Sequence, residues 1–290
     1  MGEMKRLIVN ADDFGLHSAV NHGIIEGYEK GCIRSTSFVA AGAAAKEAAE
    51  LSRKYSGLGV GIHLTLVAER PVLPPSEVPS LIGENGRLLP DHMAFIRRYM
   101  TGGVRREELY AECEAQILRA KEMGVRLTHI DSHQHLHVLP GVVNVVLSLA
   151  KKYGFTKMRL PAESILFTGG YPTSAGRYAA KCGLTSCALM AKSAIRGAGI
   201  TVPDSFFGML AGGHLYTPHF LSILQALPDG VSEIMVHPGK DNRVLDDIYH
   251  WAYHWEEELA SVTSAEAMKM IEERQIHLIS YEELMDGEIL

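Results

Sequence analysis

Residues 128–137 read T-H-I-D-S-H-Q-H-L-H, and their place between two helical patterns decides the predicted fold. The amphipathic segment 105–123 ends at Gly124 before this stretch, and the helical pattern 141–153 after it ends at Gly154. A glycine just beyond the last helical residue is a common helix end. The short apolar run 128–133 is therefore predicted to be a strand that alternates with helices.

The same alternation extends through the 290 residues. Helical patterns also cover 18–30 and 43–54. Further strand-like runs cover 6–11, 36–41, 57–66, 157–161, 233–237 and 276–281. Repeated strand–helix alternation predicts an α/β protein in which a parallel sheet is covered by helices.

Two segments interrupt this alternation. Residues 68–103 are rich in proline and glycine and too long for a simple connection, which predicts a functional loop or lid. Residues 164–203 contain no acidic residue, and they carry four basic ones: Arg177, Lys181, Lys192 and Arg196. If helical, this segment is predicted to offer a basic, partly apolar face to a membrane or a lipid-linked substrate. The alternative is an ordinary outer helix of the fold.

Composition excludes several classes of function. The formal net charge is −6, which does not favour nucleic-acid binding. The four cysteines include no C-x-x-C pair, so neither a zinc knuckle nor a disulfide framework is indicated. We find no secretory signal and no apolar run long enough for a membrane span, and we expect a cytoplasmic protein.

Polar residues gather where the predicted strands end. They are Asp12 and Asp13, His63, Asp131 and His133, Arg159, and His237; Pro161 ends the same strand as Arg159. The carboxyl ends of parallel strands are where barrels and open α/β sheets build their active sites.

Carboxylate and imidazole groups suit zinc and other first-row divalent ions. Asp13, His63 and His133 can supply the three ligands that a catalytic metal site needs, one from each of three strands. Taken singly, each could be an ordinary buried polar group, and Asp12-Asp13 could cap the next helix. Their convergence on one edge favours a metal site.

The remaining polar residues of 128–137 are expected to support this site. Alternate residues of a strand share a face, so His129 and Asp131 should point with His133 and orient the ligands. His135 and His137 lie beyond the strand and are expected to line the rim.

Five motifs carry a family resemblance. The chain contains, in order, V-N-A-D-D-F-G, G-I-H-L-T-L, T-H-I-D-S-H-Q-H-L-H, R-L-P and V-H-P-G. In these it resembles the YdjC-like carbohydrate deacetylase family, which includes chitooligosaccharide deacetylase, over residues 5–284. The segment E-R-P-V-L-P-P-S-E-V-P-S-L at 69–81 also resembles the branch associated with hopanoid biosynthesis, HpnK.

This resemblance implies a distorted (β/α) barrel of the TIM type, with a single domain over 1–290 and an inserted loop at about 68–104. It implies a hydrolase that removes acetyl groups from N-acetylated sugars, free or lipid-linked, and works as a homodimer. One divalent ion is implied; magnesium is often assigned in the family, whereas two histidine ligands favour zinc, nickel or cobalt.

The resemblance also assigns roles. Asp13, His63 and His133 would bind the metal, and His133 is thereby chosen among the four histidines of 128–137. Asp12 would be the general base toward a metal-activated water, His237 the general acid, and Arg159 the group that holds Asp12 or substrate. The remaining positions, substrate-binding or supporting, are His129, Asp131, His135, His137 and Pro161.

Two alternatives stay open. The spacing His133-x-His135-x-His137 would suit another barrel metal hydrolase, an amidohydrolase or phosphoesterase with two metals. A sugar- or metal-binding protein without catalysis is the other, although it would need neither Asp12 nor His237. The chain has no G-x-S-x-G elbow, no Walker loop and no G-x-G-x-x-G after a strand, which disfavours serine hydrolases and nucleotide-binding enzymes.

Overall fold

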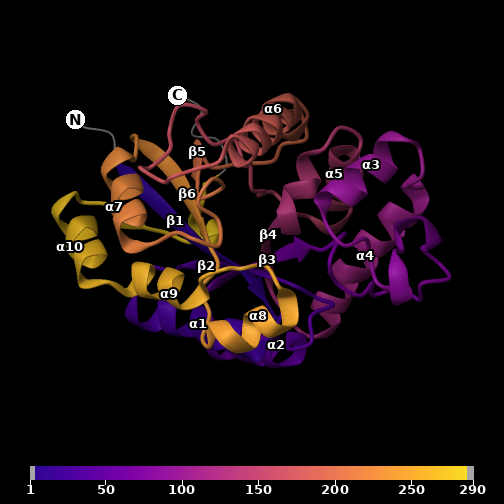
Figure 1. The fold of residues 1–290 in the computed structure, drawn as a ribbon, viewed down its shortest axis with the longest axis horizontal. Coiled ribbons are helices and arrows are strands. Elements are labelled where there is room, and N and C mark those ends of the chain that lie inside the picture. Colours follow the sequence, from indigo (N-terminus) through magenta and orange to yellow (C-terminus); the bar gives the residue numbers. More distant parts are fainter. Residues whose placement is uncertain (1–3, 286–290) are drawn as a thin grey trace.

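The computed structural model describes residues 4–285 and contains one curved parallel sheet (Figure 1). Its strands follow the order β4-β3-β2-β1-β6-β5, and β7 pairs with β1 beside this path. The strands are β1 Lys5–Phe14, β2 Ser35–Phe38, β3 Gly59–Leu64, β4 Leu127–Ser132, β5 Ser205–Phe207, β6 Gly230–Val236 and β7 His277–Leu278. Because every pairing is parallel, the carboxyl ends of the strands share one edge.

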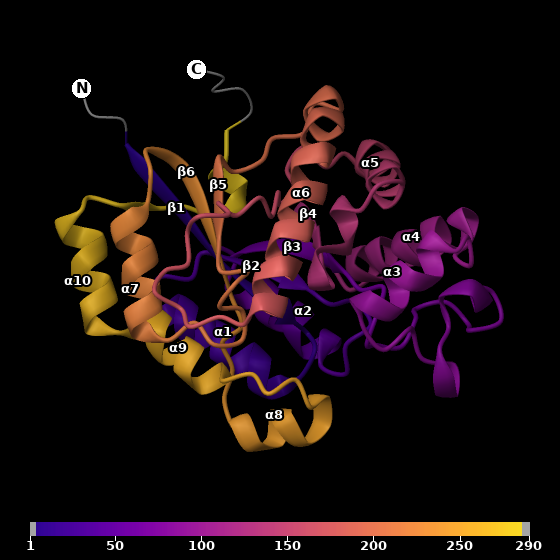
Figure 2. The same cartoon turned by 45° about the horizontal axis from the view of Figure 1, so that its top comes forward.

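Helices surround the strands on the outside (Figures 1 and 2). They are α1 Ser18–Lys30, α2 Ala45–Lys54, α3 His92–Met100, α4 Arg106–Glu122, α5 Val142–Tyr153, α6 Ala175–Gly197, α7 Thr217–Ala226, α8 Asn242–Tyr249, α9 Trp255–Thr263 and α10 Ala265–Glu273. In α5, Val142, Val145, Val146 and Leu149 recur at helical spacing, and all four are buried. Burial of each such side chain contributes about 1.5–3 kcal/mol.

The two edge strands, β4 and β5, are joined through the segment 157–163. Met158 forms a single bridge with Ile130 of β4, and Glu163 forms one with Phe206 of β5. The predicted strand 157–161 is thus irregular, because Pro161 lacks the N–H that a longer ladder needs. The sheet is thus curled into an incomplete, distorted barrel whose two edges are linked by isolated bridges, which confirms the predicted α/β architecture. The sequence did not reveal β5, which has only three residues.

The proline-rich segment 68–103 is tied to α4. Glu112 accepts hydrogen bonds from the backbone N–H groups of Val72 (2.8 Å) and Leu73 (3.0 Å), and Glu108 accepts one from Ser80 (2.7 Å). The segment also contains α3. Carboxylates of one helix therefore organise a loop that has little sheet pairing of its own.

The basic face predicted for 164–203 does not form as expected. Helix α6 is continuous through Gly183, but Lys181 is buried, donates to the carbonyl of Phe167 and lies 3.3 Å from Glu163. A buried carboxylate requires such a partner. Arg177 likewise donates to Tyr171 and to the carbonyl of Gly212. Within residues 4–285, no helix is long and apolar enough to span a bilayer.

Candidate metal centre

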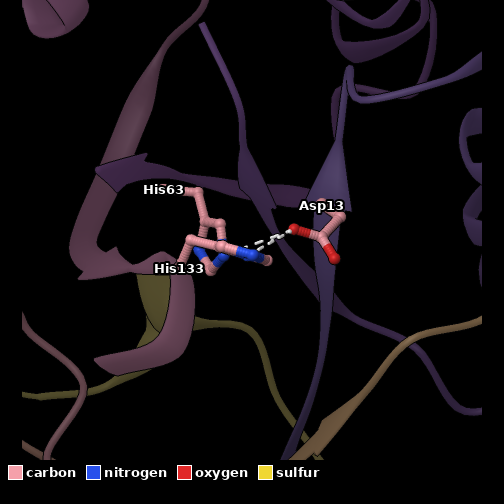
Figure 3. A group of neighbouring side chains, drawn as sticks. All are labelled: Asp13, His63 and His133. Atoms are coloured by element: carbon pink, nitrogen blue, oxygen red, sulfur yellow. Dashed lines mark hydrogen bonds and ion pairs between the residues drawn. The ribbon is translucent and has the colours of Figure 1, made fainter. Parts of the chain in front are cut away.

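Three side chains from three strand ends converge at the carboxyl edge of the sheet. Asp13 belongs to β1, His63 to β3, and His133 directly follows β4. Figure 3 shows the two imidazoles pointing toward the Asp13 carboxylate. Asp13 Oδ1 lies 3.1 Å from His133 Nδ1 and 3.5 Å from His63 Nε2.

The donor set fits a divalent ion. Ligand atoms about 2.1 Å from a tetrahedral ion are roughly 3.4 Å apart, close to the separations observed here. Asp13 Oδ2, the second oxygen of this carboxylate, is buried and has no hydrogen-bond partner among the described residues. Buried polar atoms without partners often mark a missing ligand. The three residues that the sequence suggested as metal ligands, Asp13, His63 and His133, therefore lie together in the structure.

A backbone irregularity aims the two neighbouring aspartates. Adjacent residues of a regular strand point to opposite faces. Asp13 has a φ of 71°, and the β1–β2 register shifts between Ala11 and Phe14. As a result, Asp12 Oδ2 lies 3.9 Å and Asp13 Oδ1 3.5 Å from the same atom, His63 Nε2. This left-handed conformation costs about 1–2 kcal/mol in a residue with a Cβ; such bulges often re-aim side chains at active sites.

Arg159 connects three buried carboxylates beneath the centre. Its Nη1 and Nη2 donate to the two oxygens of Asp12 at 2.7 and 2.6 Å. Nη1 also lies 2.9 Å from Asp131 Oδ2, and Nε donates to Glu233 Oε1 at 2.8 Å. Tyr281 donates to the other oxygen of Glu233 at 2.6 Å. The sequence analysis did not identify Glu233 as a site residue. An acidic residue inside the apolar run V-S-E-I-M-V is nevertheless a signal of a buried carboxylate that needs a partner.

Asp131 fixes the ring of His63. Its Oδ1 is 2.8 Å from His63 Nδ1, and its Oδ2 accepts from Ser37 at 2.6 Å. Burial lowers the pKa of His63, but the carboxylates of Asp131, Asp12 and Asp13 outweigh this and raise it to about 9. The cluster thus attracts positive charge strongly at the point where the three candidate ligands meet.

We expect Asp131→Asn to weaken metal binding about 10- to 100-fold, the usual effect of losing a carboxylate that orients a ligand histidine. Asparagine keeps an oxygen near His63 but loses the charge that also faces Arg159. Competition with a chromogenic chelator measures the affinity, and exposed Asp247→Asn is the matched control. Equal affinities for the two variants would contradict the orienting role.

The other predicted site residues lie deeper. His129 is buried, its ring stacks on Tyr281 with 3.7 Å between centroids, and burial lowers its pKa to about 3. Gly61 leaves room for it, since a Cβ there would be 2.4 Å from the imidazole. His129 therefore packs as a neutral ring below Asp131.

His135 and His137 follow β4 in a turn with left-handed residues at Gln134 and His135. His137 does not line the rim: its Nδ1 is 2.7 Å from the Ser132 hydroxyl, and its Nε2 donates to the Arg159 carbonyl at 3.0 Å. His135 packs edge-on against Phe206 and leaves Nδ1 without a partner among the described residues. Pro161 is buried in the segment that links the two edges of the sheet.

Within the part of the chain that the structure describes, neither histidine belongs to a group with metal-binding geometry. Among residues 4–285, the groups with metal-binding geometry are Asp13–His63–His133 and Asp12–His63–Asp131. The second is already bridged by Arg159. The spacing that suggested a two-metal site therefore has no counterpart in the arrangement of these side chains.

His237 directly follows β6 and is held by α9. Glu258 Oε2 accepts its backbone N–H at 2.5 Å and lies 3.7 Å from its Nδ1. Burial lowers the pKa of His237, but Glu258, with help from Asp12 and Asp13, raises it above the ordinary value. Glu258 was not predicted as a site residue, because nothing local in its helix distinguishes it.

Carboxylates, imidazoles and one arginine at the carboxyl edge of a distorted parallel barrel define an α/β-barrel protein with a candidate divalent-metal centre. The YdjC-like protein model matches residues 6–273, and the chain belongs to this family.

Named relatives agree with this assignment. A carbohydrate deacetylase of Geobacillus stearothermophilus is 32% identical over 277 residues, covering 95% of this chain and 96% of the relative. A human carbohydrate deacetylase is 35% identical over 81% of this chain and 75% of its own length. A chitooligosaccharide deacetylase of Serratia marcescens is 39% identical over 55% of this chain and 60% of its own length.

One solved structure is similar over nearly the whole chain. It is a protein of Enterococcus faecalis V583 described as a candidate cellobiose-phosphate cleavage protein. The TM-score is 0.73 at 30% sequence identity, with 97% of this chain and 99% of that chain covered.

Proposed function

We propose that this protein is a metal-dependent carbohydrate deacetylase that hydrolyses the acetamide of an N-acetylated sugar. Carbohydrate and chitooligosaccharide deacetylases among the relatives support the reaction and the substrate class. The observation that carries the proposal is the cluster Asp13–His63–His133 beside the paired Asp12 and Arg159. Such a cluster combines ligands for a cation with a held carboxylate that can accept a proton.

Asp13, His63 and His133 would hold the ion, which when bound polarises a carbonyl and makes water more acidic. Two imidazole ligands favour zinc, nickel or cobalt over magnesium on ligand softness. Asp12 Oδ2 faces this centre, 3.9 Å from His63 Nε2, and would accept the proton of the attacking water. Arg159 holds the Asp12 carboxyl group in one orientation by donating to both of its oxygens.

The leaving amine needs a proton because an amide anion is a very poor leaving group. His237 would donate it: burial lowers its pKa, but Glu258 raises it above the ordinary value, which favours the protonated imidazole near neutral pH. Glu258 stabilises the imidazolium and fixes the backbone of His237. Asp12 and His237 thus act as separate base and acid.

Acetate release tests this function directly. The metal-depleted protein is reconstituted with zinc, nickel, cobalt or magnesium and given N-acetylglucosamine, its oligomers, a phosphorylated N-acetylated disaccharide and a lipid-linked N-acetylglucosamine. We expect metal-dependent acetate release with at least one sugar. Release that is absent with every metal and sugar would refute the proposal. Sedimentation of the same sample tests the homodimer that the family resemblance implies.

We expect Glu258→Gln to shift the alkaline limb of the kcat profile to lower pH. The Glu258 carboxylate raises the pKa of His237, so its neutralisation lets the imidazole lose its proton earlier. Metal content should not change. The exposed change Glu257→Gln, one residue away, is the control. An alkaline limb that stays in place in Glu258→Gln would contradict the proton-donor role of His237.

A further inference from the structure

An aromatic strip lies between α8 and α9, where the sequence reads Y-H-W-A-Y-H-W at 249–255. The rings of Tyr249, Trp251, Tyr253 and Trp255 follow one another, with centroid separations of 4.9, 5.5 and 5.5 Å. We call Tyr249, Trp251 and Tyr253 the aromatic strip. Trp255 follows them in the sequence but is buried, with only 1% of its surface exposed.

The aromatic strip contacts both halves of the candidate site. The Trp251 ring lies 5.1 Å from the ring of His133, at an angle of 32°. The Tyr253 ring lies 5.0 Å from that of His237. A candidate metal ligand and the candidate acid are therefore flanked by neighbouring rings of one segment.

Unusual backbone conformations produce this alignment. His250 and Ala252 both have positive φ, 54° and 52°, which costs about 1–2 kcal/mol in residues with a Cβ. Asp246 accepts the N–H of Ala252 at 3.1 Å. Gly213 makes room for Tyr253, since a Cβ there would lie 2.3 Å from the ring. Strain of this kind is concentrated at functional sites.

The aromatic strip is partly exposed, and its rings also pack against the hydrophobic core. Tyr249, Trp251 and Tyr253 are half-buried, whereas His133 and His237 are only 6% and 7% exposed. The rings that contact these two histidines are thus more exposed than the histidines themselves.

We propose that the aromatic strip is the surface on which a pyranose ring of the substrate stacks, with Trp251 as the main contact. A gluco-configured ring carries its hydroxyls around the rim and presents C–H groups on its faces, so a flat aromatic ring covers it without burying unpaired polar groups. Ligand sites typically combine such apolar walls with a few polar groups. Stacking on Trp251 and Tyr253 would bring the acetamido group between His133 and His237.

Because this inference depends on the proposed function, its test measures binding without turnover. The sequence has two tryptophans, Trp251 half-buried and Trp255 buried. We would titrate the full chain with N,N′-diacetylchitobiose in a chelator, following tryptophan fluorescence and heat. Wild type should bind with a change in fluorescence, and Trp251→Phe should lose that change while it retains most of the affinity.

Trp251→Leu keeps apolar volume but removes the flat face, and it should weaken binding roughly 10- to 100-fold, as loss of an aromatic anchor commonly does. Tyr55→Ala, a half-buried tyrosine before β3 at the opposite edge of the sheet, is the control and should bind normally. Circular dichroism confirms folding, and if Trp251→Leu is unfolded, Tyr253→Leu takes its place.

The outcomes separate the two proposals. Unchanged affinity in a folded Trp251→Leu or Tyr253→Leu protein, or no binding by wild type, would overturn the stacking surface even if acetate is released. Binding that depends on Trp251 without acetate release under any metal would support the stacking surface and reject the deacetylase.

Discussion

His63→Ala is expected to lose the bound divalent ion and more than about 10³-fold of metal-dependent acetate release. A metal that stabilises developing charge supplies several kcal/mol, and each 1.4 kcal/mol corresponds to about tenfold in rate. His63 is the central candidate ligand: it faces Asp13 through Nε2 and is fixed by Asp131 through Nδ1. Elemental analysis after dialysis gives the stoichiometry, which we expect to be one ion per wild-type chain.

Exposed His22→Ala is the matched control, and it should keep both the ion and the activity. Anomalous scattering from crystals of the loaded protein locates the ion. An ion on His135 and His137 without His133 would show that the three ligands are wrongly assigned. Full metal content in His63→Ala would do the same.

His237→Ala is expected to retain the metal and the fold but to lower kcat by roughly 10²–10⁴-fold, the usual contribution of a positioned acid or base. The neighbouring carboxylates raise the pKa of His237, so the group stays protonated to higher pH than a free histidine. Activity should therefore fall on the alkaline side as His237 loses its proton. In His237→Ala this limb should disappear, because the titrating donor is gone.

A pH–rate profile at saturating substrate, with metal content determined on the same sample, measures both effects. If His237 only stabilised the fold or bound the ion, the variant would lose metal or melt at lower temperature. Near-normal release from an amide substrate with the ion retained would exclude the acid role. Ester substrates, whose leaving alcohol needs less protonation, should be affected less.

The gathering of polar groups at one edge was predictable because it follows from strand direction alone. Once the apolar runs ending at Asp13, His63 and His133 are read as parallel strands, their carboxyl ends must meet. Helix α1 was likewise predicted at Ser18–Lys30, since its apolar spacing and the glycine after it are local signals. These features need no knowledge of distant contacts.

Other features depend on contacts that no local pattern encodes. The left-handed backbone of Asp13 reflects the mismatch between β1 and β2, and period-two reasoning assigns Asp12 and Asp13 to opposite faces. Arg159 contacts carboxylates from β1, β4 and β6, which only the curvature of the sheet brings together. Lys181 looked like a surface charge because its partner, Glu163, lies in another segment.

The segment 157–163 is expected to be less resistant to heat than the rest of the sheet. It links β4 and β5 through isolated bridges and a few backbone hydrogen bonds. Two buried side chains reinforce it: Arg159 contacts carboxylates of three strands, and Glu163 accepts the N–H groups of Gly208 and Leu210. On heating, we expect the segment 157–163 to lose its structure before the β1–β6 pairing does. Loss of activity on heating would then precede global unfolding. Substitutions that raise the heat resistance of the enzyme would be sought in the segment 157–163 and its partners rather than in the core.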